Sequence, residues 1–340
     1  MSTADLKAPL PPDIVADVRD LKAWYRTSRF GVNREVKAVD GVSLVIRRDE
    51  IYGLAGESSC GKSTLIKTIA GAIRPPLEIV DGSIRFAFME GTSGLHKAPD
   101  DVAARVRWRH LSYIMQGSMS VLNPLKRVRA TFQDFAYRHL AGNNADKEAI
   151  VVAHLKRVAL ESHVLDAFPH ELSGGMRQRV TIALATVCRP EFIIADEPTT
   201  ALDVVVQKEV LAMIRSIQVE MRASVLFVTH DLGVHAHLTD RLGIMYAGRI
   251  VEEAPTRQIF AMPRHPYTRH LIESLPRIGD TKLRKGLDGA PPNLAAPPPG
   301  CRFHPRCPIA RDICRSEAPA MQTFGPEHRV ACHFAAGGHA

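Results

Sequence analysis

Gly56-Glu-Ser-Ser-Cys-Gly-Lys-Ser-Thr64 follows an apolar segment, 50–54, and leads into a segment, 62–73, in which apolar residues recur at helical spacing. It satisfies the pattern G-x-x-x-x-G-K-[ST] in the strand-to-helix context in which that pattern binds phosphate. Backbone N–H groups of such a loop point at phosphate oxygens, and the positive end of the helix dipole supports them. The residues expected to bind a nucleotide are Gly56, Ser58, Ser59, Cys60, Gly61, Lys62, Ser63 and Thr64.

A second apolar segment, 192–195, ends in Asp196 and Glu197. Because it follows a phosphate loop in the same chain, this acidic pair predicts nucleotide hydrolysis. Lys62 would neutralise the β- and γ-phosphates of the nucleotide, and Ser63 and Asp196 would hold Mg²⁺. Glu197 would orient and deprotonate the attacking water.

The composition is that of an ordinary globular chain, because 45% of its 340 residues are hydrophobic and 24% are charged. The formal net charge of +8 suits an anionic ligand, a membrane surface or nucleic acid about equally. No uncharged apolar run is long enough to span a bilayer, which excludes a membrane channel. Residues 1–13 lack the regions of a signal peptide, so we expect a loose N-terminal lead-in on a cytoplasmic protein.

Strand-like and helix-like segments alternate from residue 14 to about residue 260, which predicts an α/β fold. Residues 117–190 have helical patterning with no strong strand and are interpreted as a helical insertion. A hairpin is expected at 241–251, with its turn at Ala247-Gly248. The other expected strands are 43–48, 50–54, 192–195 and 225–228.

Leu172-Ser-Gly-Gly-Met-Arg-Gln-Arg179 lies between the phosphate loop and the acidic pair, and it resembles the signature sequence of ABC ATPases. Gln116 resembles the Q-loop glutamine of that family, Ala201-Leu202-Asp203 its D-loop and His230 its switch histidine. The resemblance covers residues 14–260. It implies an α/β fold of the P-loop ABC ATPase type, with a RecA-like core, a β-subdomain and a helical subdomain.

The resemblance also implies roles for these residues. Gln116 and His230 would join Glu197 in catalysis, and Gln116 would contact Mg²⁺. Tyr25, or Trp24 beside it, would stack on adenine. Ser173 and Gly175 would act across a dimer, on the γ-phosphate of the ATP held by a second subunit, and Gly174 and Asp203 are also expected to bind nucleotide.

Two positions depart from the family pattern. Ser59 stands where relatives have glycine, and serine adds strain if that position requires a positive φ. Gly117 replaces the acidic residue that often follows the Q-loop glutamine. Neither change removes a residue with an assigned chemical role.

The C-terminal part resembles the tail of the oligopeptide/dipeptide importer ATPases, a group that includes nickel importers. The resemblance begins at Arg264-His-Pro-Tyr-Thr268 and continues, after proline runs at 291–292 and 297–299, through Gly300-Cys-Arg-Phe-His-Pro-Arg-Cys-Pro308. We expect an ATPase domain at 14–265 and a C-terminal region at 266–340, which carries a small separate Cys-rich module. Its arginines would form a solvated face or a partner contact; they are Arg302, Arg306, Arg311 and Arg315.

Four cysteines crowd into the last forty residues, and in a reducing compartment such a group favours a metal site over disulfides. Four thiolates can hold zinc or an iron–sulfur cluster, or the thiols can be unligated. No C-x-x-C knuckle is present, and the resemblance favours a [4Fe–4S] cluster. Its expected ligands are Cys301, Cys307, Cys314 and Cys332.

The function expected from the resemblance is ATP hydrolysis, with Mg²⁺, that energises uptake of di- or oligopeptides by an ABC importer. The alternatives are nickel or oligosaccharide import, and a soluble ABC ATPase of translation or DNA repair. The expected partners are a second ATPase, favoured as a paralogue, two transmembrane permeases and an extracytoplasmic solute-binding protein, with no nucleic acid. The chain would then lie peripherally at the cytoplasmic face of a bacterial or archaeal cell membrane.

Overall fold

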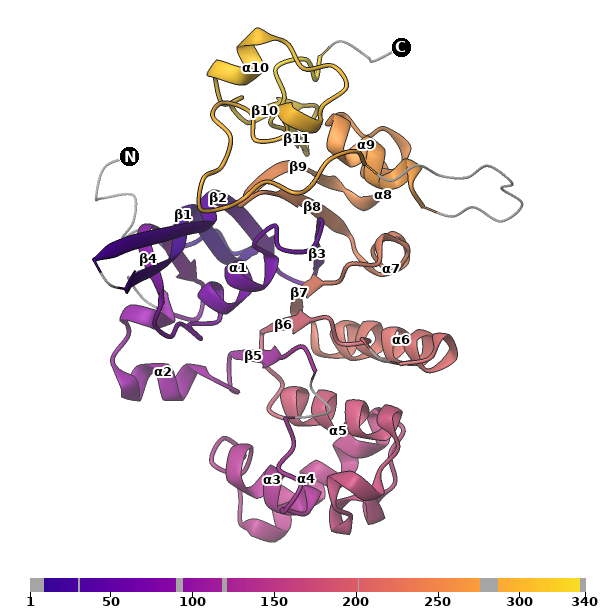
Figure 1. The fold of residues 1–340 in the computed structure, drawn as a ribbon. Coiled ribbons are helices and arrows are strands. Elements are labelled where there is room, and N and C mark those ends of the chain that lie inside the picture. Colours follow the sequence, from indigo (N-terminus) through magenta and orange to yellow (C-terminus); the bar gives the residue numbers. More distant parts are fainter. Residues whose placement is uncertain are drawn as a thin grey trace.

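The computed structural model describes residues 9–29, 31–89, 94–117, 121–200, 202–275 and 287–336. Most of the N-terminal lead-in and Ala201 of the D-loop lie outside these ranges. Figure 1 shows a small sheet beside a larger central sheet, a helical region at one end of the central sheet and the C-terminal segment at the other. In the described ranges, no helix combines the length and the apolar character needed to cross a membrane.

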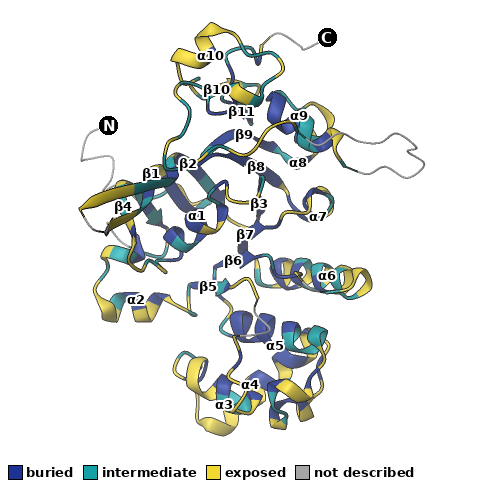
Figure 2. Ribbon diagram, viewed as in Figure 1, coloured by how far each residue is buried: buried dark blue, intermediate teal, exposed yellow. Residues whose placement is uncertain are grey.

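The central sheet has eight strands within the described residues, in the order β10-β11-β9-β8-β3-β7-β6-β5. Every residue of β3, β6, β7 and β8 is buried, so these strands are covered on both faces, as is usual in parallel sheets. Figure 2 draws them dark blue. The mutually parallel strands are β3 (Ile51–Ala55), β5 (Leu111–Ile114), β6 (Phe192–Asp196), β7 (Ser224–Val228) and β8 (Arg241–Tyr246).

The strands predicted at 50–54, 192–195 and 225–228 are confirmed as β3, β6 and β7. The predicted hairpin consists of β8 and β9 (Arg249–Pro255), which pair antiparallel. Its turn lies at Ala247-Gly248, and both turn residues have positive φ, 47° and 84°. Two left-handed residues give the turn the twist that a two-residue hairpin requires.

The small sheet is antiparallel and, in the described part of the chain, has three strands in the order β2-β1-β4. Its strands are β1 (Ile14–Arg29), β2 (Val32–Arg47) and β4 (Leu77–Phe86). The segment predicted at 43–48 is the end of the much longer β2. Register shifts interrupt the pairing of β1 and β2, and such bulges break the period-2 alternation by which long strands are detected in a sequence.

Helix α1 (Lys62–Ile69) follows the phosphate loop and packs between the two sheets, with Leu65 and Ile66 fully buried. It ends at Ile69 rather than at residue 73, because Gly71 takes a left-handed φ of 66°. A Cβ at Gly71 would lie 2.7 Å from Cβ of Leu95, so the close approach of that residue also requires glycine.

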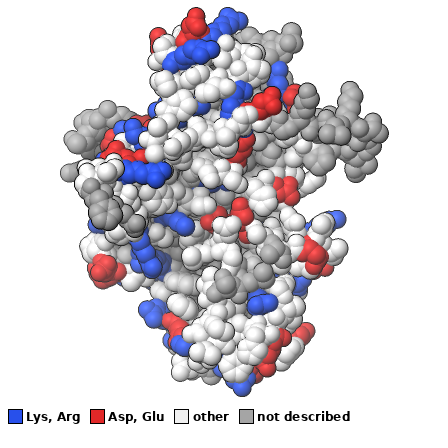
Figure 3. All heavy atoms as spheres, in the orientation of Figure 1, with Lys and Arg blue, Asp and Glu red and all other residues white. Residues whose placement is uncertain are grey.

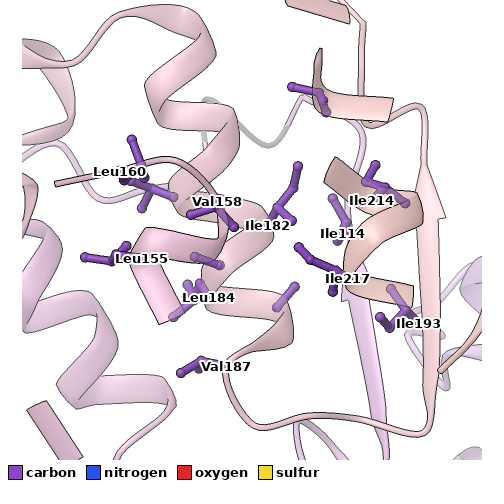
Figure 4. Close-up of a cluster of buried hydrophobic side chains, with 14 of the residues drawn as sticks. Ile114, Leu155, Val158, Leu160, Ile182, Leu184, Val187, Ile193, Ile214 and Ile217 are labelled. Carbon is purple, nitrogen blue, oxygen red and sulfur yellow. The ribbon is translucent and has the colours of Figure 1, made fainter. Parts of the chain in front are cut away.

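The helical insertion predicted at 117–190 is confirmed. It contains α3 (Val128–Phe135), α4 (Asn144–Arg157) and α5 (Gly174–Thr186), with short 3₁₀ turns at Ser162–Asp166 and Pro169–Glu171. Helix α5 joins this region to the central sheet through one continuous apolar core (Figure 4). In that core, Leu155 of α4 and Ile182 of α5 belong to the same cluster as Ile193 of β6.

The remaining helices of the ATPase part are α2 (Asp100–Val106), α6 (Val204–Met221) and α7 (Leu232–Leu238). Helix α6 covers the central sheet with Val210, Ile214 and Ile217, which pack in the core of Figure 4. Its N-terminus is capped by Asp203, whose carboxylate accepts hydrogen bonds from the N–H groups of Val205 and Val206.

The C-terminal segment contains α8 (Thr256–Ala261), α9 (Pro266–Glu273), α10 (Asp312–Ser316), β10 (Gln322–Phe324) and β11 (His328–Val330). It does not form the separate module expected from the proline runs, because β11 pairs with β9 and extends the central sheet. Phe303 is 1% exposed and packs in one cluster with Tyr246 of β8. The division of the chain at residues 265 and 266 stays a prediction.

The expectation that the four arginines form a solvated face or a partner contact is wrong for two of them. The side chains of Arg302 and Arg306 are 7% and 6% exposed, and each forms an ion pair with the ATPase part. Arg302 pairs with Asp40 of β2 and donates to the carbonyl of Ala247. On the face drawn in Figure 3, Lys and Arg side chains lie among Asp and Glu, at the C-terminal end as elsewhere.

Candidate nucleotide site

The phosphate loop runs from the end of β3 into α1, and its backbone conformation depends on two glycines. Gly56 and Gly61 have φ values of 152° and 108°. A Cβ on Gly56 would lie 2.1 Å from the carbonyl oxygen of Met245, and one on Gly61 would lie 2.0 Å from that of Ala38. Neither position accepts a side chain, so the backbone conformation of the loop requires glycine at both.

Ser59 has a φ of 64°, so this position does require the left-handed conformation in which a serine is strained. An L-residue in this region costs about 1 kcal/mol or more. The serine therefore adds strain to the loop. Ser58 and Ser63 are exposed like Ser59, whereas Cys60 and Thr64 are buried.

Lys62 folds back onto its own loop. Its ammonium donates to the carbonyl oxygens of Gly56, at 2.6 Å, and Glu57, at 2.9 Å. The sulfur of Cys60 lies 3.7 Å from the same nitrogen, and burial raises the pKa of that thiol. An incoming phosphate has to compete with these two carbonyls for the lysine.

Asp196 ends β6 and is 2% exposed. The hydroxyl of Tyr113, on the neighbouring strand β5, donates to its Oδ2 at 3.2 Å. Burial raises the pKa of Asp196, and the hydrogen bond from Tyr113 partly opposes this rise. Tyr113 was not among the predicted site residues, because its proximity to Asp196 comes from the pairing of β5 with β6.

Three side chains converge on Glu197. Its Oε2 accepts hydrogen bonds from Nε2 of Gln116, at 3.2 Å, and from Oγ1 of Thr200, at 2.8 Å. Nδ1 of His230 lies 3.3 Å from Oε1. The structure thus brings together all three residues expected to act in catalysis and adds Thr200, which the sequence analysis missed. Glu197 also has a positive φ, 46°, so its backbone is held in an uncommon conformation next to the site.

Tyr25 and Trp24 lie in different surroundings. The hydroxyl of Tyr25 is 3.2 Å from Oγ1 of Thr64, in the first turn of α1. The ring of Trp24 is flanked by Lys37 and Arg26, whose charged groups lie 5.0 and 5.4 Å from its centroid. Tyr25 is therefore the aromatic residue placed beside the phosphate loop, and its stacking on adenine stays a prediction.

The signature residues lie at the start of α5. Ser173 is the N-cap of this helix, and its hydroxyl accepts a hydrogen bond from the N–H of Met176. A Cβ on Gly175 would lie 3.0 Å from Cγ1 of Val206, so the N-termini of α5 and α6 lie side by side. Ser173, Gly174, Gly175 and Asp203 therefore occupy two adjacent helix N-termini, which are suited to an anion. Their action on a partner's nucleotide stays a prediction.

The residues expected to hold Mg²⁺ are Ser63, Gln116 and Asp196. Within the described ranges, no group of three or more His, Cys, Asp or Glu is placed to hold a metal ion. This finding does not bear on a magnesium site of this kind, because Mg²⁺ takes one or two protein oxygens together with water and substrate phosphates.

The same finding does bear on the four C-terminal cysteines. All are free, and the structure does not arrange them as a ready ligand set, so the iron–sulfur prediction is not confirmed. Some of them do lie close together: the N–H of Cys301 donates to the carbonyl oxygen of Cys314 at 2.9 Å, and Cys301 and Cys307 pack against one apolar cluster. Burial raises the pKa of the Cys307 thiol to about 11, and thiolate charge on a neighbouring cysteine would raise it further.

Nearby backbone N–H groups partly oppose the rise in pKa that burial causes at three of the four thiols. They belong to Phe303 and His304 for Cys301, to Ile309 for Cys307 and to Phe334 for Cys332. An N–H group near a sulfur stabilises thiolate rather than thiol. The donor set is therefore chemically compatible with a bound metal or cluster.

Comparisons with known proteins agree with this site. The family model "ABC transporter" matches residues 39–200, and "Oligopeptide/dipeptide transporter, C-terminal region" matches residues 251–314. A dipeptide transport ATP-binding protein of Caldanaerobacter subterraneus is 37% identical over 324 residues, which cover 94% of this chain and 97% of the relative. An oligopeptide transport ATP-binding protein of Bacillus subtilis is 36% identical over 95% of this chain and 98% of its own length.

Among solved structures, a dimeric ATP-binding cassette bound to ADP and Pi has the same fold, with a TM-score of 0.61 at 24% identity. The matched region covers 71% of this chain and 99% of the cassette. A component of an ABC transporter complex from Clostridium perfringens gives a TM-score of 0.60 at 23% identity, over 74% of this chain and 92% of its own. With its two family matches and its relatives over nearly the whole length, this chain belongs to the ATP-binding proteins of the oligopeptide/dipeptide ABC transporter family.

Proposed function

We propose that this chain is the ATP-hydrolysing subunit of an ABC importer that takes up dipeptides or oligopeptides. The observation that supports this class of cargo most directly is the family match at 251–314, which lies outside the ATPase motifs and is named for oligopeptide and dipeptide transporters. Relatives that match almost the whole chain are named for dipeptide or oligopeptide transport.

In the proposed reaction, backbone N–H groups of the phosphate loop and Lys62 bind the phosphates of ATP. Ser63, Gln116 and Asp196 would hold Mg²⁺, and the ion would supply positive charge that neutralises the phosphate oxygens. Glu197 takes the proton from the attacking water. Gln116, Thr200 and His230 keep its carboxylate in place through the contacts described above.

The proposal includes a second ATPase subunit, two permeases and an extracytoplasmic binding protein, with this chain peripheral at the cytoplasmic face of the membrane. The two adjacent helix N-termini of α5 and α6 would meet the γ-phosphate of ATP held by the second subunit. Closing and reopening of the ATPase pair would then drive the permeases. Among the described contacts, no ion pair or hydrogen bond joins Ser173–Gly175 to the phosphate loop. This is compatible with their action on the nucleotide of the second subunit.

The test is uptake of labelled di- and oligopeptides by the native host, comparing wild type with a Glu197→Gln strain. Loss of peptide uptake is expected, because without the carboxylate the water is not deprotonated. Unchanged uptake, with the variant protein present at its usual level, would contradict the peptide assignment and direct the same assay to nickel or oligosaccharides.

We further propose that Cys301, Cys307, Cys314 and Cys332 hold a [4Fe–4S] cluster that clamps the C-terminal segment. The closeness of Cys301 to Cys314 and to Cys307, and the backbone N–H groups that favour thiolate at three of the cysteines, support this. The expected result is iron and sulfide in anaerobically purified protein. Stoichiometric zinc in protein from the native host, or no metal in either preparation, would overturn it.

A further inference from the structure

Arg306 of the C-terminal segment forms a bidentate ion pair with Glu57, the second residue of the phosphate loop. Its two terminal nitrogens lie 2.8 Å and 3.0 Å from the two carboxylate oxygens. The residues are 249 positions apart in the sequence, and the arginine side chain is 6% exposed. A paired planar fork of this kind is stronger and more directional than a single surface contact.

The guanidinium of Arg306 is itself held from other sides. Its Nε donates to the carbonyl oxygen of Asp288 at 3.1 Å, and a terminal nitrogen donates to the hydroxyl of Tyr246 at 3.3 Å. The side chain has little freedom to swing away from Glu57. It therefore fixes the position of the carboxylate instead of following it.

Glu57 connects Arg306 to Lys62, the lysine expected to bind phosphate. Its N–H donates to the hydroxyl of Tyr267, a fully buried residue of α9, at 2.8 Å. Its carbonyl oxygen accepts a hydrogen bond from Lys62. Two residues of the C-terminal part, Arg306 and Tyr267, thus hold Glu57 in place. The carbonyl of Glu57 is one of the groups from which the Lys62 ammonium must move away to bind phosphate.

We propose that Arg306 is a positioning residue of the nucleotide site: it fixes Glu57 and neutralises its charge beside the place where the phosphates of ATP bind. The side chain of Glu57 is 23% exposed with Arg306 in place, and without Arg306 it would be an unpaired carboxylate next to the anion-binding loop. Such a charge repels phosphate and leaves the first turn of the loop less constrained. This proposal rests on the ATPase site and not on the identity of the cargo.

The test measures binding of the non-hydrolysable analogue AMP-PNP with Mg²⁺ to the purified full-length chain by isothermal titration calorimetry. Arg306→Ala is expected to raise the Kd about tenfold, because the unpaired carboxylate of Glu57 would repel the phosphates and the loop would be less constrained. Arg306→Lys, which keeps the charge but loses the fork, gives an intermediate Kd. The matched control is Arg315→Ala, an exposed arginine of the same segment, whose Kd stays that of wild type.

The double variant Arg306→Ala/Glu57→Gln separates positioning from a merely structural role. It removes the unpaired charge without restoring any contact to Arg306, so its Kd should return most of the way to the wild-type value. The defect of Arg306→Ala alone should also shrink at higher ionic strength, because salt screens the repulsion.

A wild-type Kd for both Arg306 variants, or no recovery in the double variant, would overturn the proposal. Thermal unfolding of each variant shows whether it is folded. If Arg306→Ala does not fold, the test is the Kd of Arg306→Lys compared with that of the wild type. The assay uses no peptide, so its failure is distinguishable from a failure of the peptide proposal.

Discussion

Replacing Ser59 with glycine should relieve the backbone strain in the phosphate loop. The left-handed φ of 64° costs a residue with a Cβ about 1 kcal/mol or more, and glycine adopts it freely. The greater freedom of glycine in the unfolded chain offsets about 0.5 kcal/mol of this gain. We therefore expect Ser59→Gly to raise the free energy of unfolding by about 0.5 to 1 kcal/mol.

The assay is urea unfolding without nucleotide, with Ser59→Ala as the matched control. Alanine removes the hydroxyl but keeps the Cβ, so it should not stabilise the protein. Affinity for MgATP should change little in either variant, because the loop already has the backbone conformation that glycine favours. If Ser59→Gly is no more stable than Ser59→Ala, the strain argument is refuted.

The other predictions concern the lysine of the loop and a buried histidine. Lys62→Ala should abolish ATP hydrolysis, since no other group takes its place between the two loop carbonyls and the phosphates; full turnover of ATP in this variant would contradict the phosphate-loop assignment. His154 is 2% exposed, and burial lowers its pKa to about 4. The unfolded chain therefore binds the proton first, and stability is lost as the pH falls below the unfolded pKa of about 6.5. Between pH 7 and pH 5 the loss from this residue is about 2 kcal/mol, and His154→Gln should flatten the profile by that amount in urea titrations at each pH. An identical pH dependence in the two proteins would show that His154 does not titrate as described.

The ATPase core could be predicted from the sequence because its signals are local. The phosphate loop, the acidic pair and the apolar strands each occupy a few consecutive residues, and their order along the chain is informative. The paired β1 and β2 were underestimated because bulges break their alternation. The predicted end of α1 is too late because it follows the apolar spacing and leaves out the stop signal of Gly71, which ends the helix in a left-handed conformation.

The contacts between the C-terminal segment and the ATPase core could not be predicted in this way. Arg306 and Glu57 are 249 residues apart, and nothing near either residue indicates the other. A group of arginines on a small Cys-rich segment indicates a solvated face when the segment is assumed to stand alone. The assumption failed because β11 pairs with β9, and because Arg302 contacts β2 and Arg306 contacts the phosphate loop.

The most direct test of the central claim is ATP hydrolysis by the complete transporter in proteoliposomes, measured with and without peptide and binding protein. The account predicts hydrolysis that peptide stimulates in the wild type. In the Glu197→Gln transporter, hydrolysis should be lost while MgATP still binds, because the three side chains around residue 197 remain and only the base is gone. Undiminished hydrolysis in that variant would contradict the assignment of Glu197, and hydrolysis indifferent to every peptide tested would contradict the peptide cargo.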